Sequence, residues 1–263
     1  MTLSDEAVAV LAEPDPTAKA RKAQAMAGRW RSGAIAELGG AVPPDRPARP
    51  ARPELLPPRM MPKRRRAQTP AGRIALLHAL AHIELNAIDL ACDIIARFGA
   101  GFPRGFGDDW TTVAAEEALH FTLLTERLAE YGTAYGDLPA HDGLWQAAAE
   151  TSDDALARLA VVPLVLEARG LDVTPPMIAS LRKAGDEPSA AMLARLYDDE
   201  IGHVAVGRRW FDWLCGARGL EPLATWQSLV RRHFRDGLKR PFNAEARSRA
   251  GLAPPFYEPL AGG

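Results

Sequence analysis

The sequence lacks the features that mark two common kinds of redox protein. Only two cysteines occur among 263 residues, Cys92 and Cys215, too few for a disulfide framework or a thiolate cluster. Both stand in apolar, helix-like surroundings, where a cysteine is usually a small buried hydrophobe. A Gly-rich dinucleotide fingerprint is also missing. If the protein carries out redox chemistry, we therefore expect a separate electron donor.

The sequence also has no large excess of one charge and no long apolar run. The formal net charge is -1, so no overall basic field favours nucleic acid, although local patches can still do so. No charge-free apolar stretch is long enough to span a bilayer. The acidic start Ser4-Asp5-Glu6 does not resemble a secretory signal. We therefore expect a cytoplasmic protein without a membrane partner.

A strand pattern of alternating polar and apolar residues is not found over any useful length. Apolar residues recur instead at helical spacing, most clearly from Arg73 to Phe98. The sequence therefore predicts an all-α fold. The predicted helices cover residues 4–38, 73–98, 108–131, 152–169, 174–184, 187–216 and 222–238.

Proline and arginine dominate one stretch, residues 42–62, which cannot hold a regular helix and is predicted to be extended. The basic run 63–66 follows, either as a solvated linker end or as a nucleic-acid or membrane contact. A second basic face is predicted around Arg231, Arg232 and His233. The predicted organisation is an N-terminal helical extension (1–41), this Pro/Arg-rich segment (42–70), a helical bundle (71–240) and a tail (241–263).

Two predicted helices carry a glutamate three residues before a histidine: Glu117 with His120, and Glu200 with His203. A step of three residues puts both side chains on one face of a helix. A carboxylate and an imidazole together suit a transition metal such as iron or manganese. One such pair is weak evidence, since a surface glutamate beside a partly buried histidine is common.

Two further glutamates strengthen the metal interpretation because the interval is repeated. Glu84 precedes Glu117 by 33 residues (117 − 84), and Glu167 precedes Glu200 by 33 residues (200 − 167). Both stand in apolar surroundings, where a carboxylate costs several kcal/mol unless something compensates it. One glutamate from each of two helices and Glu-x-x-His from each of two others is the ligand pattern of ferritin-like di-metal carboxylate proteins.

Neighbouring residues are assigned supporting roles. Glu116 and Asp199 directly precede the paired glutamates, and we expect them to accept the other ring N–H of the ligating histidines. Pro163 stands four residues before Glu167, removes a backbone hydrogen bond and should kink the helix locally. His78 and His82 are expected to be structural or partner-facing.

Five stretches together resemble a bacterial ferritin-like family of unknown function, which in turn is similar to the di-iron tRNA hydroxylase group. The resemblance implies a ferritin-like four-helix bundle with added N-terminal and C-terminal helices. It also implies that Glu84, Glu117, His120, Glu167, Glu200 and His203 bind two metal ions, iron, manganese or a mixed pair, and form the catalytic centre. The stretches are 82–90 (HIELNAIDL), 116–121 (EEALHF), 135–145 (YGDLPAHDGLW), 167–175 (EARGLDVTP) and 199–204 (DEIGHV).

Three functions follow as hypotheses. The first is an O2-dependent hydroxylase or oxidase that acts on a small molecule or an RNA. The second is a ferritin-type iron-binding or ferroxidase protein without an organic substrate. The third is a helical module that binds a partner through its Pro/Arg-rich segment, which leaves the four glutamates in apolar surroundings unexplained.

Overall fold

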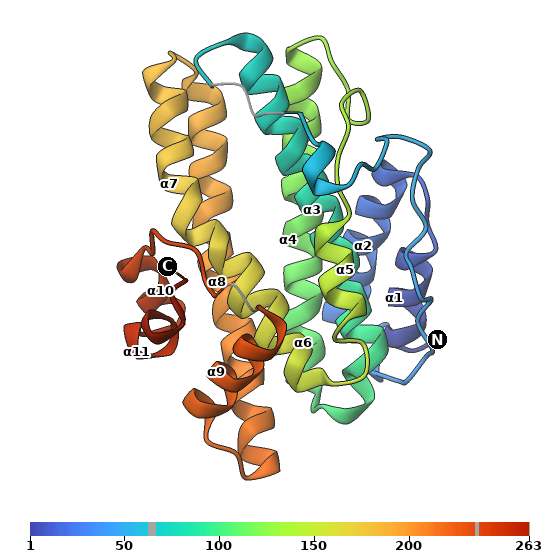
Figure 1. The fold of residues 1–263 in the computed structure, drawn as a ribbon. Coiled ribbons are helices and arrows are strands. Elements are labelled where there is room, and N and C mark those ends of the chain that lie inside the picture. The colour runs from blue at the N-terminus through green and yellow to red at the C-terminus, as the bar shows by residue number, and fades with distance from the viewer. Residues whose placement is uncertain (63–66, 235–236, 263) are drawn as a thin grey trace. The chain divides into compact units, whose positions relative to one another are not determined.

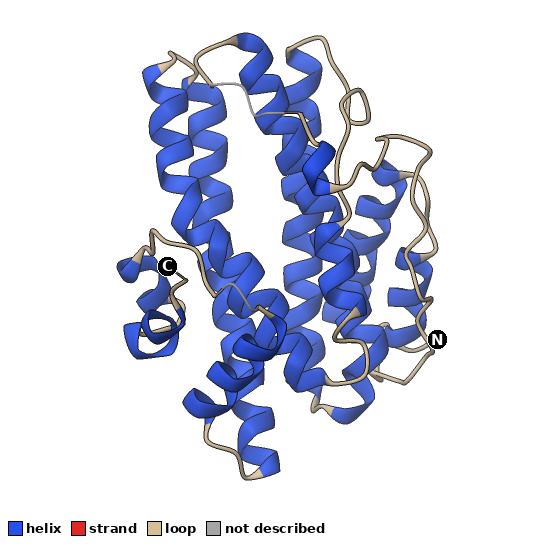
Figure 2. Ribbon diagram, viewed as in Figure 1, coloured by secondary structure: helices blue, strands red, loops and turns tan. Residues whose placement is uncertain are grey.

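A computed structural model describes residues 1–62, 67–234 and 237–262, and the ordered elements in these ranges are all helical (Figures 1 and 2). Strands are absent from the same ranges, apart from two isolated bridges, Leu55 with Ala140 and Leu238 with Ala261. The predicted all-α class is therefore confirmed. The basic run 63–66 lies outside the described residues.

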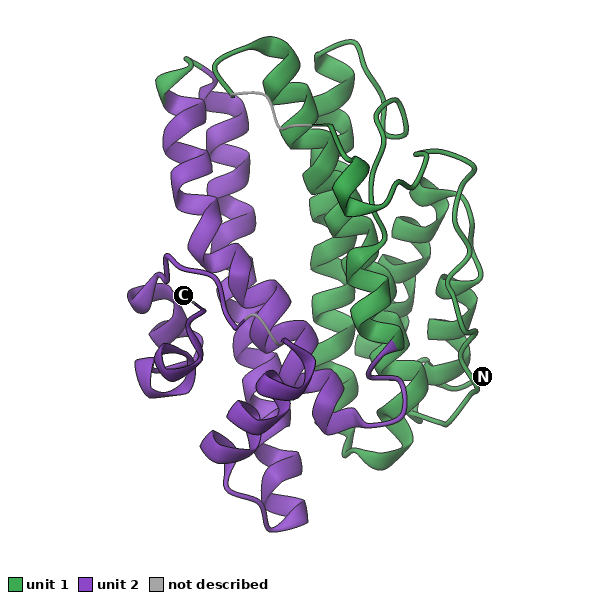
Figure 3. Ribbon diagram, viewed as in Figure 1, with its two compact units in different colours: residues 1–149, 183–185 green, residues 150–182, 186–263 purple. Residues whose placement is uncertain are grey.

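The chain forms two compact units (Figure 3), residues 1–149 with 183–185 and residues 150–182 with 186–263. Unit 1 contains α1 (Leu3–Leu11), α2 (Pro16–Arg31), η1 (Pro58–Met60), α3 (Pro70–Phe98), η2 (Gly99–Gly101), α4 (Arg104–Glu130) and α5 (Gly143–Ala149). Unit 2 contains α6 (Ala155–Val161), the π-helical turn η3 (Val162–Glu167), α7 (Ala168–Lys183), α8 (Glu187–Arg218), α9 (Pro222–His233), α10 (Ala244–Arg249), α11 (Pro254–Tyr257) and η4 (Glu258–Leu260).

The core of unit 1 is the pair α3 and α4, on which α1 and α2 pack (Figure 1). Gly107 of α4 allows Trp30 of α2 to pack closely against α4, because a Cβ at position 107 would lie 2.7 Å from Trp30 Cζ2. Residues Pro70–Gly101 are, by length and composition alone, apolar enough to cross a membrane. Most of that stretch is buried within the protein, and the core helix of a soluble protein gives the same pattern.

The predicted helix boundaries need correction near the N-terminus. The first forty residues form two helices, not one, because Pro14 and Pro16 interrupt the chain and the Asp15 side chain caps α2. The helix α4 begins at Arg104, with Pro103 at its N-cap, four residues before the predicted start at 108. The short helices α5, α10 and α11 were not predicted.

Helix α7 is continuous where two helices were predicted, one ending at Gly170 and the next opening at Thr174-Pro175. A proline at 175 has no N–H to donate to the carbonyl of Leu171. The side chain of Asn243 donates to that carbonyl instead, with Nδ2 and O 3.3 Å apart. A tertiary contact therefore satisfies the acceptor that the proline leaves open. Helix α9 ends at His233, whereas the sequence predicted that it would extend to residue 238.

Residues 42–62 of the Pro/Arg-rich segment hold no α-helix, as predicted, although Pro58–Met60 forms a short 3-10 helix, and polar contacts hold the segment against α2 and α3. Lys19 Nζ of α2 donates to the carbonyl of Ala48 at 2.9 Å. The same nitrogen lies 2.5 Å from Asp89 Oδ1 of α3, and Arg49 Nη2 lies 3.0 Å from Asp89 Oδ2. Lys19 and Asp89 are both almost fully buried. The segment is thus part of the fold, fastened by an internal ion-pair cluster.

Two buried histidines of α3 hold the loop after α4, which agrees with the structural role predicted for them. His78 Nε2 accepts the N–H of Gly136 at 2.9 Å and that of Leu138 at 3.4 Å. His82 Nδ1 lies 2.8 Å from the hydroxyl of Tyr135. The loop therefore depends on neutral imidazoles.

Acidification should destabilise this loop through His78. Its Nε2 accepts N–H bonds and must be unprotonated, and burial lowers the pKa of His78 below 6.5. The unfolded chain takes up a proton near that ordinary value, whereas the folded chain takes it up only at lower pH. Stability present above the ordinary pKa is therefore lost as the pH falls toward the folded value. Urea denaturation should show the free energy of unfolding decreasing from about pH 7 to about pH 5.

The variant His78→Gln should flatten that decrease, because a glutamine oxygen accepts N–H bonds without titrating. His233→Gln, a change at a half-buried histidine of α9, is the control and should keep the wild-type slope. An unchanged slope in His78→Gln would assign the pH dependence to other groups.

Candidate metal centre

In unit 1, the structure brings three of the predicted ligands together in the core. Glu84 lies on α3, and Glu117 and His120 lie on α4. His120 Nδ1 is 3.4 Å from Glu84 Oε2 and 3.5 Å from Glu117 Oε2. Each residue offers a ligand atom, and these atoms lie within 4.8 Å of one another. All three side chains are buried, so this is a buried glutamate and histidine cluster that could hold a metal ion.

The electrostatics of this cluster reflect two carboxylates held out of water. Burial raises the pKa of Glu84 well above its usual range, and the neighbouring Glu117 raises it further. For His120, burial acts to lower the pKa, but contacts with Glu117 and Glu84 outweigh it and raise the pKa to about 11. The cluster therefore favours a positive charge between the two carboxylates.

In unit 2, the other three predicted ligands lie on η3 and α8. His203 Nδ1 is 3.8 Å from Glu200 Oε1, and His203 is buried while Glu200 keeps some exposure. Glu167 is half-buried and is the last residue of the π-helical turn. As in unit 1, the histidine turns Nδ1 toward the carboxylate three residues before it. At Pro163, where a local kink was predicted, the chain forms a π-helical turn, a feature that is frequent at functional sites.

The two residues expected to orient the histidines, Glu116 on α4 and Asp199 on α8, are both half-buried. Their role toward His120 and His203 stays a prediction.

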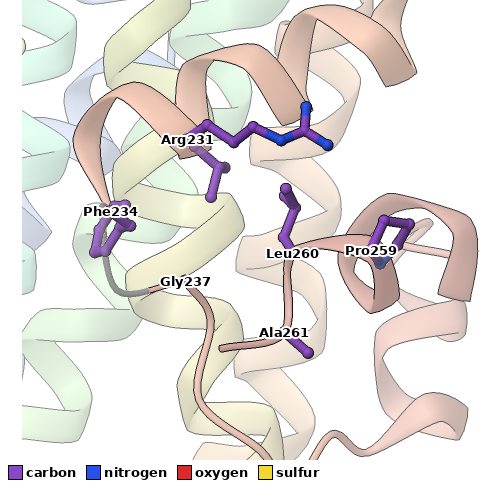
Figure 4. Close-up of a pocket in the computed structure, with 7 residues that line it drawn as sticks. Arg231, Phe234, Gly237, Pro259, Leu260 and Ala261 are labelled. Carbon is purple, nitrogen blue, oxygen red and sulfur yellow. The ribbon is translucent and has the colours of Figure 1, made fainter. Parts of the chain in front are cut away.

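A shallow pocket lies between the end of α9 and the C-terminal segment (Figure 4), and it contains none of the predicted ligands. Arg231, from the basic face predicted at this helix, is one of its lining residues. Beside the pocket, an isolated bridge joins Leu238, which follows α9, to Ala261 near the C-terminus. In it, Leu238 N donates to Leu260 O at 2.8 Å. The sequence did not predict this pocket, because no local motif marks the return of the C-terminus to α9.

Comparison with known proteins matches the chain to a family and to a relative for which no function is described. The profile of a family described as "Protein of unknown function (DUF455)" matches residues 12–258. A protein of Haemophilus influenzae, described as an uncharacterized protein, is 41% identical over 209 residues, which cover 77% of this chain and 72% of that relative. No solved structure matches the chain.

Proposed function

The chain belongs to the DUF455 family, and we propose that it is a di-metal carboxylate protein, with iron as the metal and an O2-dependent oxidation as its reaction. The observation that carries the proposal is the buried cluster of Glu84, Glu117 and His120. Two carboxylates and an imidazole are a ligand set for a first-row transition metal. A cation bound there would balance the charge that burial makes costly.

A second metal ion is proposed from the repeat in the sequence. The Glu-x-x-His helix of unit 2 follows Glu167 at the same 33-residue interval that separates Glu84 from Glu117. In both units the histidine Nδ1 faces the glutamate three residues earlier. We propose that the two sets of three ligands together form one centre, in a bundle of ferritin-like type. Glu116 and Asp199 would fix the orientation of the two imidazoles.

Bound iron would supply the redox chemistry, and the protein would supply ligands, orientation and exclusion of water. The four carboxylates would balance the charge of the ions, and each histidine would hold one ion. A small molecule or an RNA would be the substrate, and a separate protein would deliver electrons, since the chain has no cysteine cluster.

A ferritin-type iron-binding protein is the second candidate, because the same buried ligands could serve iron oxidation without an organic substrate. The partner-binding alternative is weakened by the Pro/Arg-rich segment, whose Ala48 and Arg49 are already engaged by α2 and α3. A free contact segment would leave such groups available.

Metal analysis of protein purified without added metal tests the proposal. We expect close to two iron or manganese ions per chain, and O2 consumption when a reductant is supplied. A ferritin-type store would take up far more than two ions per chain. Protein that contains neither metal, and that shows no di-iron spectrum after anaerobic addition of Fe(II), would refute the di-metal proposal.

A further inference from the structure

The π-helical turn Val162–Glu167 is stabilised by contacts of residues that are not predicted metal ligands. The N–H of Ala168 donates to the carbonyl of Pro163, five residues earlier, which is the bond of a π-turn. Pro163 itself has no N–H to offer the α-helical pattern. The indole N–H of Trp226 on α9 donates to the carbonyl of Ala160 at 3.1 Å, just before the turn. In a regular α-helix that carbonyl would accept from Leu164.

Helix α8 approaches this turn at a glycine. A Cβ on Gly207 would overlap Pro163 Cβ and lie 2.5 Å from Pro163 Cγ. The next neighbour, Leu164 Cδ2, would be 3.6 Å away. The proline ring therefore occupies the space that any other residue at 207 would need, and the two backbones are closer than a side chain would permit.

The position of this contact matters because of the register between η3 and α8. Gly207 lies seven residues after Glu200 and four after His203, so the three share one face of α8. Since η3–α7 and α8 are joined by the turn at Gly185, they run in opposite directions. Moving one turn forward from Pro163 reaches Glu167, and moving one turn back from Gly207 reaches His203.

We propose that Pro163 and Gly207 are positioning residues whose close contact sets where Glu167 stands relative to Glu200 and His203. The inference rests on the proposed metal function, since it assigns these residues to the metal ion held by unit 2. The equivalent positions of the first repeat, four before Glu84 and seven after Glu117, are Leu80 and Leu124. The Pro–Gly contact is thus particular to the second half of the centre.

Titration of metal-free protein with Co(II), followed by visible absorption and by calorimetry, tests the proposal. Wild type should bind two Co(II) per chain. Gly207→Ala should keep one tight ion and weaken the second about 10- to 100-fold, the range seen when groups that orient metal ligands are changed. Gly216→Ala, the same change at an exposed glycine of α8 with open space around it, is the control and should bind both ions as wild type does.

A second variant separates positioning from simple damage. Pro163→Gly combined with Gly207→Ala removes the atoms that would collide and keeps the close approach, so it should regain most of the lost affinity. Wild-type affinity for both ions in Gly207→Ala would overturn the proposal, as would a folded double variant whose second ion is as weak as in Gly207→Ala. If Gly207→Ala does not fold, the folded double variant must still bind two ions. Wild type that binds no Co(II) would instead remove the proposed function, and this inference with it.

Discussion

Replacing Glu84 with glutamine is expected to abolish most metal binding and to make the metal-free protein more stable. The amide keeps the shape of the side chain and cannot acquire the negative charge that burial and the neighbouring Glu117 disfavour. A gain in stability with a loss of function is typical when a residue of a strained active site is replaced. Thermal unfolding with and without Mn(II) measures both effects. In wild type, metal at a thousand times its Kd should add about 4 kcal/mol, and the variant should lose that increment.

The pH dependence of the stability gain has a definite sign. Burial, and then Glu117, raise the pKa of Glu84 in the folded protein above its ordinary value of 4.5. Ionisation of Glu84 therefore opposes folding, so stability present below the ordinary pKa is lost as the pH rises toward the folded value. The gain from Glu84→Gln should accordingly be larger at about pH 8 than at about pH 5.

Glu126→Gln, at an exposed glutamate of α4, is the matched control and should change neither metal binding nor stability. A Glu84→Gln protein that is less stable than wild type without metal, and that still gains stability from Mn(II), would show that Glu84 is a structural residue and no ligand.

The second large effect is expected at Lys19. Lys19→Met removes the cation that lies 2.5 Å from Asp89 Oδ1, and it leaves that buried carboxylate with Arg49 as its remaining ion-pair partner. Breaking a buried pair from one side typically costs about 3–5 kcal/mol. Urea denaturation should show the loss, and limited proteolysis should show earlier cleavage near residue 48, because the bond from Lys19 to the carbonyl of Ala48 is lost as well.

Two companion variants make this prediction specific. Lys22→Met, one turn of α2 further on, removes a surface pair with Glu13 and should cost much less than Lys19→Met, because solvent screens that pair. Lys19→Met combined with Asp89→Leu should be more stable than Lys19→Met alone, since the buried carboxylate is removed and the partly exposed Arg49 keeps its hydrogen bond to Asn86. Equal losses in Lys19→Met and Lys22→Met would mean that burial of the Lys19 pair adds nothing to stability.

Periodicity and spacing predicted most helices, the extended segment and the repeated glutamates, because those are local patterns. Prediction failed where a distant group changed a local rule. A helix start was predicted at Pro175, but α7 runs through it, and Asn243, 68 residues further on (243 − 175), donates to the Leu171 carbonyl that the proline leaves open. Lys19 and Asp89 could not be paired from the sequence, since 70 residues separate them. At Pro163 the sequence predicted a kink and not a π-turn, because the contacts of that turn with Trp226 and Gly207 are tertiary.

The pairing of Lys19 with Asp89 also constrains the order in which α2 and α3 can pack during synthesis. The α1–α2 hairpin leaves the ribosome before α3, and its lysine can pair with Asp89 only after that residue has followed. At translation rates of about 5–20 residues per second, the 70 residues between them take roughly 4–14 seconds. Lys19 therefore stays hydrated until α3 has been synthesised. The final packing of the α1–α2 hairpin is thus coupled to the folding of α3, the helix that also carries Glu84.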